Sequence, residues 1–214
     1  MDKDLICFDL DNTLISSNKA HVMAFELAFK KNNLKKINAK KIEPLLNGRH
    51  AHDIVKMLFP KLRSDAINNV VNDHHHFLRL TAKHARQIGH ADKTLRLLRK
   101  KYKIALVSNC IHKEINFLLK SANIRRNAFD YIIGKEDVEH SKPYPDEIFK
   151  AEHLSHIKAK FMVGDSVYDI MAAKKAKVGA ISVLTGLAKI KEILKYKPDF
   201  IANDVNELPR MLLR

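Results

Sequence analysis

Hydrophobic positions follow two rhythms along this chain. Short continuous apolar runs predict buried strands at residues 5–8, 103–107, 131–133, 160–163, 179–184 and 200–201. Between several of these runs, apolar residues recur at helical spacing and predict helices at about residues 95–98, 114–122, 145–153 and 168–175. Strands that alternate with helices indicate a parallel sheet covered by helices on both faces.

The segment from about residue 18 to residue 88 has a different pattern. Its apolar residues recur at helical spacing throughout, and polar breaks near residues 30–38, 47–48 and 59–60 divide it into several helices. No strand is predicted there. We therefore expect an α/β core formed by residues 1–15 and 89–214, with an all-helical insertion of residues 16–88 after the first strand.

The composition excludes several classes of protein. Among 214 residues, 46% are hydrophobic and 29% are charged, with six glycines and six prolines, so the chain is neither collagen-like nor of low complexity nor wholly disordered. No apolar run approaches the ~20 residues of a membrane span, so no membrane association is expected. The first residues carry acids where a secretory signal has a basic segment, and we expect a cytoplasmic protein.

The charge is unevenly distributed. The chain carries a net charge of +15, and residues 16–88 hold fourteen basic and five acidic side chains, a net +9. Such a surface favours anionic partners. A nucleic acid is one candidate, but the chain has no tryptophan, no interleaved aromatic stripe and no recognised nucleic-acid-binding motif. Nucleic acid is therefore the less favoured partner, although it stays open.

Polar residues follow the predicted strands at the edge where parallel sheets bind ligands. Asp9 and Asp11 follow the first strand, Ser108 and Asn109 follow another, and Asp165 follows a third. Carboxylates gathered at one sheet edge repel one another unless a cation joins them. Oxygen ligands suit Mg²⁺, which keeps coordination positions open for water and phosphate. We expect the carboxylates of Asp9, Asp11 and Asp165 to meet around Mg²⁺.

Four motifs in this order resemble those of the haloacid dehalogenase-like hydrolases, within the branch of phosphoglycolate phosphatase and β-phosphoglucomutase. They are residues 9–13 (Asp-Leu-Asp-Asn-Thr), Ser108 with Asn109, Lys142 before Pro143, and residues 164–169 (Gly-Asp-Ser-Val-Tyr-Asp). The resemblance covers essentially the whole chain. It implies a Rossmann-like three-layer core with a parallel sheet, and it makes the helical insertion a cap over the active site.

The resemblance also implies roles for the acids. Asp9 attacks phosphorus and forms an aspartyl-phosphate, while Asp11 first protonates the leaving oxygen and then activates water. Asp9, the main-chain carbonyl of Asp11 and Asp165 would hold Mg²⁺, and Asp169 would support that site directly, through water or through Lys142. The chemistry is consistent, because a second carboxyl group can act as acid and then as base.

Phosphate contacts follow from the same resemblance. Ser108 and the Asn109 backbone would hold phosphate oxygens, and Lys142 would supply a fixed positive charge. In the cap, residues 45–50 are similar to the loop that faces the active site in this branch, so Arg49 is a candidate for contact with an anionic leaving group. A plain turn between helices, with Gly48 ending the first helix, explains the same residues equally well.

Other conspicuous residues have ordinary explanations. Successive helical residues point ~100° apart, so His74, His75 and His76 cannot all converge on one metal ion, and we expect them on a solvated helix face. His50 and His52 are interpreted likewise. Cys7 and Cys110 are expected to be small buried hydrophobic residues. The six lysines of residues 30–41 predict an exposed surface between helices.

These observations lead to a Mg²⁺-dependent phosphatase, monomeric or homodimeric, that acts on a small phosphorylated metabolite such as phosphoglycolate or a sugar phosphate. The dehalogenases of this superfamily lack the second acid of the first motif, so the resemblance, with Asp11 present, favours phosphoryl over carbon–halogen chemistry. Two alternatives stay open: a phosphomutase of the β-phosphoglucomutase type, and an end phosphatase of nucleotides or nucleic acids that uses the basic cap.

Overall fold

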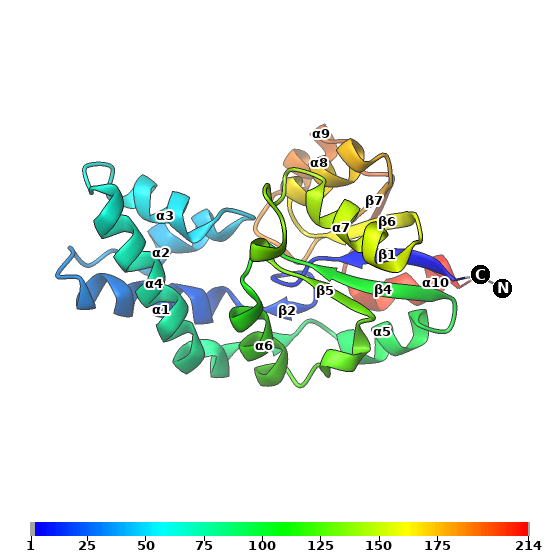
Figure 1. The fold of residues 1–214 in the computed structure, drawn as a ribbon, viewed down its shortest axis with the longest axis horizontal. Coiled ribbons are helices and arrows are strands. Elements are labelled where there is room, and N and C mark those ends of the chain that lie inside the picture. Colours follow the sequence, from blue (N-terminus) through cyan, green and yellow to red (C-terminus); the bar gives the residue numbers. More distant parts are fainter. Residues whose placement is uncertain (1–2, 214) are drawn as a thin grey trace.

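A computed structural model describes residues 3–213 of the chain. The molecule consists of an α/β part built on one large sheet and a helical part that lies beyond one end of that sheet (Figure 1). We call these parts the core and the cap. The chain passes from the core to the cap after the first strand and returns before helix α5.

The core sheet is entirely parallel. Its six strands lie in the order β5–β4–β1–β6–β7–β8, and each neighbouring pair runs in the same direction. The strands are β1 (Asp4–Phe8), β4 (Tyr102–Val107), β5 (Tyr131–Ile133), β6 (Ala159–Gly164), β7 (Gly179–Val183) and β8 (Phe200–Ala202). All six coincide with predicted strands to within about two residues, so the prediction of a parallel α/β sheet is confirmed.

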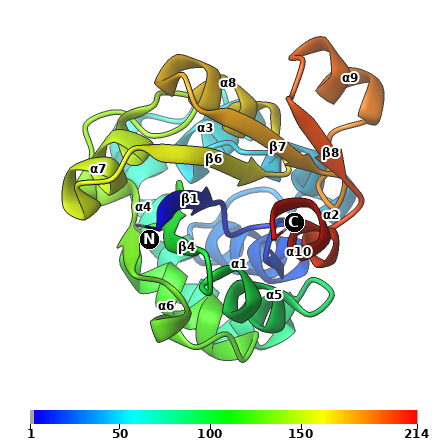
Figure 2. The same ribbon diagram turned by 90° about the vertical axis from the view of Figure 1, so that its right-hand side faces the viewer.

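Side chains of the central strand alternate between two hydrophobic layers, as the strand period requires. Ile6 and Phe8 pack with α5 (Ala91–Leu98), α6 (His112–Ser121) and α10 (Leu208–Leu212). Leu5 and Cys7 pack with the helices of the other face, which are α7 (Asp146–Ser155), α8 (Val167–Ala176) and α9 (Ile190–Lys195). Figure 2 shows these two groups of helices on opposite sides of the strands. The three-layer architecture is thus confirmed.

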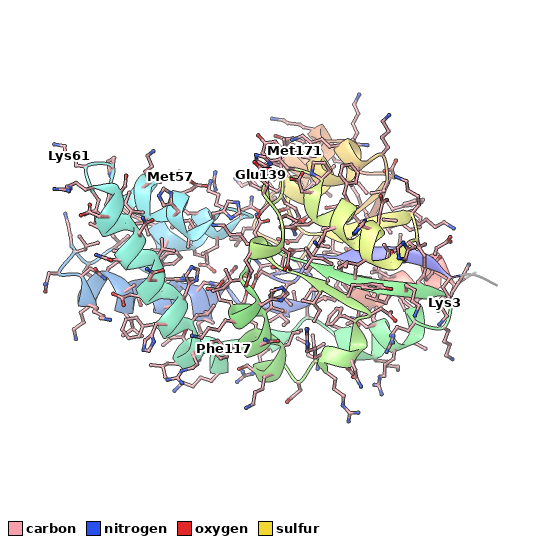
Figure 3. All side chains as sticks on the ribbon, viewed as in Figure 1. Lys3, Met57, Lys61, Phe117, Glu139 and Met171 are labelled. Atoms are coloured by element: carbon pink, nitrogen blue, oxygen red, sulfur yellow. The ribbon has the colours of Figure 1, made fainter. Side chains whose placement is uncertain are left out.

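The cap has a hydrophobic cluster of its own. Phe25 and Phe29 of one helix pack against Ile67 and Val70 of another, within a cluster separate from the two layers of the core. The cap helices are α1 (Asn18–Lys31), α2 (Ala39–Ile42), α3 (Ala51–Leu58) and α4 (Ser64–Thr81). Met57 and Lys61 project from it far from the core sheet (Figure 3). This separate cluster is what allows a helical segment to stand apart from the sheet.

One local prediction is wrong, because the crossings between cap and core contain strands. Strand β2 (Ile15–Ser16) pairs antiparallel with β3 (Arg86–Gln87), in the segment predicted to be purely helical. Two-residue strands carry no periodicity, so the sequence pattern could not reveal them. The ladder ties together the outgoing and returning chains, close to the expected boundaries at residues 15 and 89.

Short single-turn helices complete the described chain: η1 (Glu43–Leu46), η2 (Ala82–His84), η3 (Arg126–Ala128), η4 (Lys135–Asp137) and η5 (Val205–Glu207). Helices α9 and α10 were not predicted from the sequence. Among residues 3–213, no helix combines the length and the apolar character that crossing a membrane requires.

Candidate active site

The polar residues that follow the strands meet at one edge of the sheet, as predicted. Asp9 follows β1, Ser108 follows β4, and Asp165 follows β6. A pocket lies between this edge and the cap, and these three residues line it together with Asp11 and Lys142. The parallel sheet thus brings residues that lie more than 150 positions apart in the sequence into one pocket.

Three buried carboxylates and one lysine meet at the base of the pocket, and we call this group the floor. Asp9, Asp165 and Lys142 line the pocket, and Asp169 contacts Lys142 without lining it. Oxygen atoms of Asp9, Asp165 and Asp169 lie within 4.8 Å of one another. The Nζ atom of Lys142 donates to Asp9 Oδ1 at 2.5 Å, to Asp169 Oδ1 at 2.8 Å and to the Val107 carbonyl at 3.0 Å. Lys142 is only 3% exposed. The lysine therefore holds two of the three acids in fixed positions.

Local structure fixes Asp169. It lies in the first turn of α8, where its carboxylate accepts hydrogen bonds from the backbone N–H of Ser166 at 3.0 Å and from the Ser166 hydroxyl at 2.6 Å. This reciprocal pattern is a capping box, which satisfies free N–H groups at the start of a helix. A side chain at Gly164 would overlap Asp169, and one at Gly186 would overlap Asp165. Both glycines leave room for the acids.

Burial makes these carboxylates costly to ionise. It raises the pKa of Asp9 to about 7, where neighbouring Asp169 and Asp11 add to the effect and Lys142 opposes it. Burial and the charges of Asp9 and Asp169 likewise raise the pKa of Asp165 well above its usual value. One lysine cannot balance three carboxylates. This donor set, all oxygen and short of positive charge, fits a hard divalent cation such as Mg²⁺.

The Asp11 carboxylate has separate partners. It accepts hydrogen bonds from the Ser17 hydroxyl and, at 3.1 Å, from the Cys110 thiol, and it lies 3.4 Å from Nε2 of His21. Burial raises its pKa, but the hydrogen bond and charge of His21, together with the hydrogen bonds from Ser17 and Cys110, outweigh burial and hold the pKa below the usual value. The carboxylate that lies within 4.8 Å of those of Asp9 and Asp165 is that of Asp169, whereas the Asp11 carboxylate, which was expected beside them, has these other partners.

Ser108 and Asn109 lie beside the acids. Ser108 is buried, and its hydroxyl accepts a hydrogen bond from the Cys110 backbone N–H at 3.2 Å. The amide of Asn109 donates to the carbonyl of Gly48 at 3.0 Å and to that of Lys142 at 3.1 Å. Asn109 therefore joins the cap loop to the core at the mouth of the pocket.

The cap loop reaches the pocket. Gly48, Arg49 and His50 line it, and Lys135 lines it from the core side. Gly48 has φ of +72°, and a side chain there would overlap the ring of Tyr168. The loop therefore needs glycine both for its backbone and for its close approach to the core. The prediction of a solvated His50 is wrong, since this half-buried residue faces the pocket.

A family model described as haloacid dehalogenase-like hydrolase matches residues 6–183, which include all four motifs. The chain belongs to the haloacid dehalogenase-like hydrolases. This confirms the resemblance drawn from the motifs, and it makes the protein an enzyme. Asp9, Ser108, Lys142 and Asp165, which carried the resemblance, all line one pocket.

Individual members of the family match the chain over nearly its full length. Pyrophosphatase PpaX of Bacillus mycoides is 26% identical over 217 residues, covering 98% of this chain and 96% of that protein. Among solved structures, a hydrolase from Pseudomonas syringae superposes with a TM-score of 0.84 at 21% identity, covering 99% and 98% of the two chains. A predicted phosphoglycolate phosphatase from Haemophilus somnus gives 0.84 at 22% identity, covering 98% and 97%. The fold of core and cap is shared with both structures.

The three histidines of α4, His74, His75 and His76, were expected on a solvated helix face, and two of them are not there. His74 is 2% exposed, and its ring stacks on those of His21 and Phe25. His75 is half-buried and pairs with the buried Glu114 of α6, 2.7 Å from Nδ1 to Oε1. His76 alone of the three is exposed. The expected solvated face is therefore wrong for His74 and His75, which lie where the cap meets the core.

Of the two cysteines, one agrees with the prediction and one does not. Cys7 is fully buried in the sheet, as predicted, whereas Cys110 lines the pocket and contacts Asp11. The expectation of two buried hydrophobic residues is thus wrong for Cys110. The lysine-rich surface is confirmed, because all six lysines between residues 30 and 41 are exposed.

Proposed function

We propose that this hydrolase is a Mg²⁺-dependent phosphatase that cleaves a small phosphorylated compound through an aspartyl-phosphate on Asp9. One observation carries the proposal. The Asp9 carboxylate lies in the pocket, held through Oδ1 by Lys142, while Asp11 lines the same pocket with different partners. Two carboxylates with separate partners can take two different roles, a nucleophile and a proton donor. The pKa of Asp11 lies below its usual value, so Asp11 must take up its proton when the phosphate binds, because a neighbouring negative charge raises the pKa of a carboxyl group.

In the first step, an oxygen of Asp9 forms a bond to phosphorus and the bond from phosphorus to the leaving oxygen breaks. Asp11, in its protonated form, gives its proton to that oxygen. In the second step, water attacks the phosphorus of the aspartyl-phosphate, Asp11 takes a proton from the water, and Asp9 is released as a carboxylate. The division into two displacements lets one acid act in both directions.

The floor of the pocket would hold the metal. We propose Asp9, Asp165 and the main-chain carbonyl of Asp11 as its ligands, with Asp169 supporting them through Lys142. Bound there, Mg²⁺ would reduce the repulsion between the carboxylates and the incoming phosphate. Ser108 and the Asn109 backbone would hold phosphate oxygens, and Lys142 would add a fixed positive charge.

The charges that line the pocket suggest the substrate class. Arg49 from the cap and Lys135 from the core line it with cationic groups. A leaving group with an anionic charge of its own would match them. The relatives point the same way, because one is named a pyrophosphatase and another a phosphoglycolate phosphatase. The leaving group is phosphate for inorganic pyrophosphate and glycolate for phosphoglycolate, and both carry a negative charge.

The organisation of the chain fits this role. We propose that residues 16–88 form a cap domain that selects the leaving group, while residues 1–15 and 89–214 form the catalytic domain. Closure of such a cap would exclude water from the site. A cytoplasmic location and a monomeric or homodimeric state stay predictions.

A substrate panel tests the function. The full chain would be assayed with Mg²⁺ on phosphoglycolate, sugar phosphates, inorganic pyrophosphate and a phosphorylated oligonucleotide. We expect release of inorganic phosphate from one of the small anionic compounds, and no activity after the metal is removed with EDTA. Isomerised sugar phosphate in place of free phosphate would identify a mutase instead, and preference for the oligonucleotide would identify an end phosphatase.

A further inference from the structure

Three metal-binding side chains of different chemistry meet where the cap joins the core. Asp11 follows β1, His21 lies on α1 of the cap, and Cys110 follows β4. One ligand atom from each lies within 4.8 Å of the other two. The Cys110 sulfur is 3.1 Å from Asp11 Oδ2, and His21 Nε2 is 3.4 Å from Asp11 Oδ1.

These separations are close to those of a tetrahedral site. Zinc bonds of about 2.0–2.1 Å to nitrogen and oxygen and about 2.3 Å to sulfur place neighbouring ligand atoms roughly 3.3–3.6 Å apart. The distance of 3.4 Å between His21 and Asp11 falls in this range, and the distance of 3.1 Å between Cys110 and the other oxygen of Asp11 would have to lengthen slightly. We propose that Asp11, His21 and Cys110 form a second metal site, which takes Zn²⁺ or a similar transition-metal ion. All three residues line the pocket, so an ion can reach them and a fourth position stays open to water.

The second site differs in kind from the floor of the pocket. Asp9, Asp165 and Asp169 offer oxygen alone, which suits a hard ion. The new site offers one sulfur, one nitrogen and one oxygen, and thiolate and imidazole ligands favour zinc and its neighbours over magnesium. The two sites therefore select different ions although they share one pocket.

A contact with His74 orients the His21 ring for this role. The Nδ1 atom of His21 lies 3.2 Å from Nε2 of the buried His74, while His74 Nδ1 makes no hydrogen bond and lies 3.6 Å from the carboxylate of Glu114. When each histidine carries its proton on Nδ1, the protons face Glu114 and His74, and Nε2 of His21 is left with a free lone pair facing Asp11. Metal-binding histidines commonly hold their second nitrogen against such a partner.

Binding exchanges protons for the ion. The Cys110 thiol donates to Asp11 in the structure. Burial lowers the pKa of His21, but its contact with Asp11 and the charge of Glu114 outweigh burial and raise that pKa above its usual value. The ion would therefore displace the thiol proton and the Nε2 proton of His21 to solvent, and Cys110 would bind as thiolate and His21 as neutral imidazole. The bound ion would join the cap helix α1 to the two core loops that carry Asp11 and Cys110. Because it would also occupy the Asp11 carboxylate, it would inhibit turnover, a consequence that rests on the proposed function.

Spectroscopy with Co²⁺ tests the site without relying on activity. The full chain, kept in excess Mg²⁺ so that the oxygen site is filled, would be titrated with Co²⁺. We expect a sulfur-to-cobalt charge-transfer band in the near ultraviolet that saturates at one equivalent. Cys110→Ser should abolish the band, and His21→Gln should weaken Co²⁺ binding by about tenfold or more.

Matched variants complete the test. Cys7→Ala removes the other cysteine, and His76→Gln removes an exposed histidine of the cap; both should keep the band and its affinity. Circular dichroism would verify that each variant is folded, and Cys110→Ala would replace a serine variant that is not. Absence of the band in the wild type, its survival without Cys110, or unchanged affinity in His21→Gln would overturn the proposal. A protein that shows no phosphatase activity would still give the cobalt band, so failure of the proposed function can be told apart from failure of this proposal.

Discussion

The Nζ atom of Lys142 lies 2.5 Å from Oδ1 of Asp9, although the two residues are 133 positions apart in the sequence. The same nitrogen contacts Asp169, so a single buried cation binds two of the three acids at the floor of the pocket. Burial disfavours the charged lysine, yet Asp169 and Asp9 outweigh it and hold the pKa of Lys142 well above its usual value. The lysine thus stays charged throughout the working pH range.

Replacing Lys142 therefore should affect both activity and stability. Lys142→Met leaves buried carboxylates without their cation, and breaking a buried ion pair costs about 3–5 kcal/mol. We expect turnover to fall by roughly a hundredfold or more, because the phosphate also loses a positive contact. Steady-state kinetics and chemical denaturation measure the two effects, with the exposed Lys113→Met as control. Equal behaviour of both variants would contradict this role.

Asp165 should determine the metal affinity. Asp165→Ala removes one oxygen ligand from the floor of the pocket, so we expect the Mg²⁺ concentration for half-maximal activity to rise about tenfold or more. Asp65→Ala is a matched control, since Asp65 is an exposed acid of α4 that lies outside the three-carboxylate cluster. An unchanged Mg²⁺ midpoint in Asp165→Ala would show that Asp165 is not a ligand.

Arg49 should affect the choice of substrate rather than the chemistry. Arg49→Ala removes a charge-assisted contact of about 1.5–3 kcal/mol to an anionic leaving group, which corresponds to a roughly ten- to hundredfold loss in kcat/KM. The loss should appear with the best substrate of the panel and not with p-nitrophenyl phosphate. Equal losses on both compounds would indicate that Arg49 acts in folding or cap closure. No loss on either would show that Arg49 does not contact the substrate and that the loop is only a turn between helices.

His74 should make stability depend on pH. Burial lowers its pKa to about 3, with Glu114 opposing the shift, whereas an unfolded histidine has a pKa near 6.5. Between these values the unfolded chain binds the extra proton, so this residue lowers the free energy of unfolding as pH falls, by up to about 1.4 kcal/mol per unit.

Denaturation at pH 7 and at pH 5 measures the contribution of His74. His74→Gln should flatten the decline in unfolding free energy between these two values, because glutamine does not titrate. The exposed His76→Gln should retain the wild-type slope. A His74→Gln variant with the same slope as the wild type would show that His74 is not the titrating group.

Much of the core could be predicted because local signals and strand topology agree. Apolar runs placed the strands, and the parallel arrangement brought Asp9, Ser108 and Asp165 to one edge without any knowledge of distances. The family resemblance gave Lys142 a fixed positive charge in the site, but its contact with Asp9 came only from the structure. The Asp169 carboxylate was harder to place, since the capping box that turns it toward Lys142 depends on where α8 begins.

The boundary between cap and core was predicted less well. His74 falls on the same helical face as Ile67, Val70 and Leu78, so the periodicity of α4 contained a signal for its burial. Its neighbours His21 and Glu114 lie on α1 and α6, and no local sequence pattern predicts that these three residues are in contact. Cys110 also followed a strand, but its contact with Asp11 depends on the packing of two loops.

The nucleophile is the central claim, and the turnover of Asp9→Asn tests it most directly. Asparagine fills nearly the same volume but is a far weaker nucleophile, so the fold should be retained. We would measure phosphate release with Mg²⁺ and the best substrate of the panel, on protein shown to be folded by circular dichroism. The account predicts no turnover above background. Phosphate release at the wild-type rate from folded Asp9→Asn would contradict it.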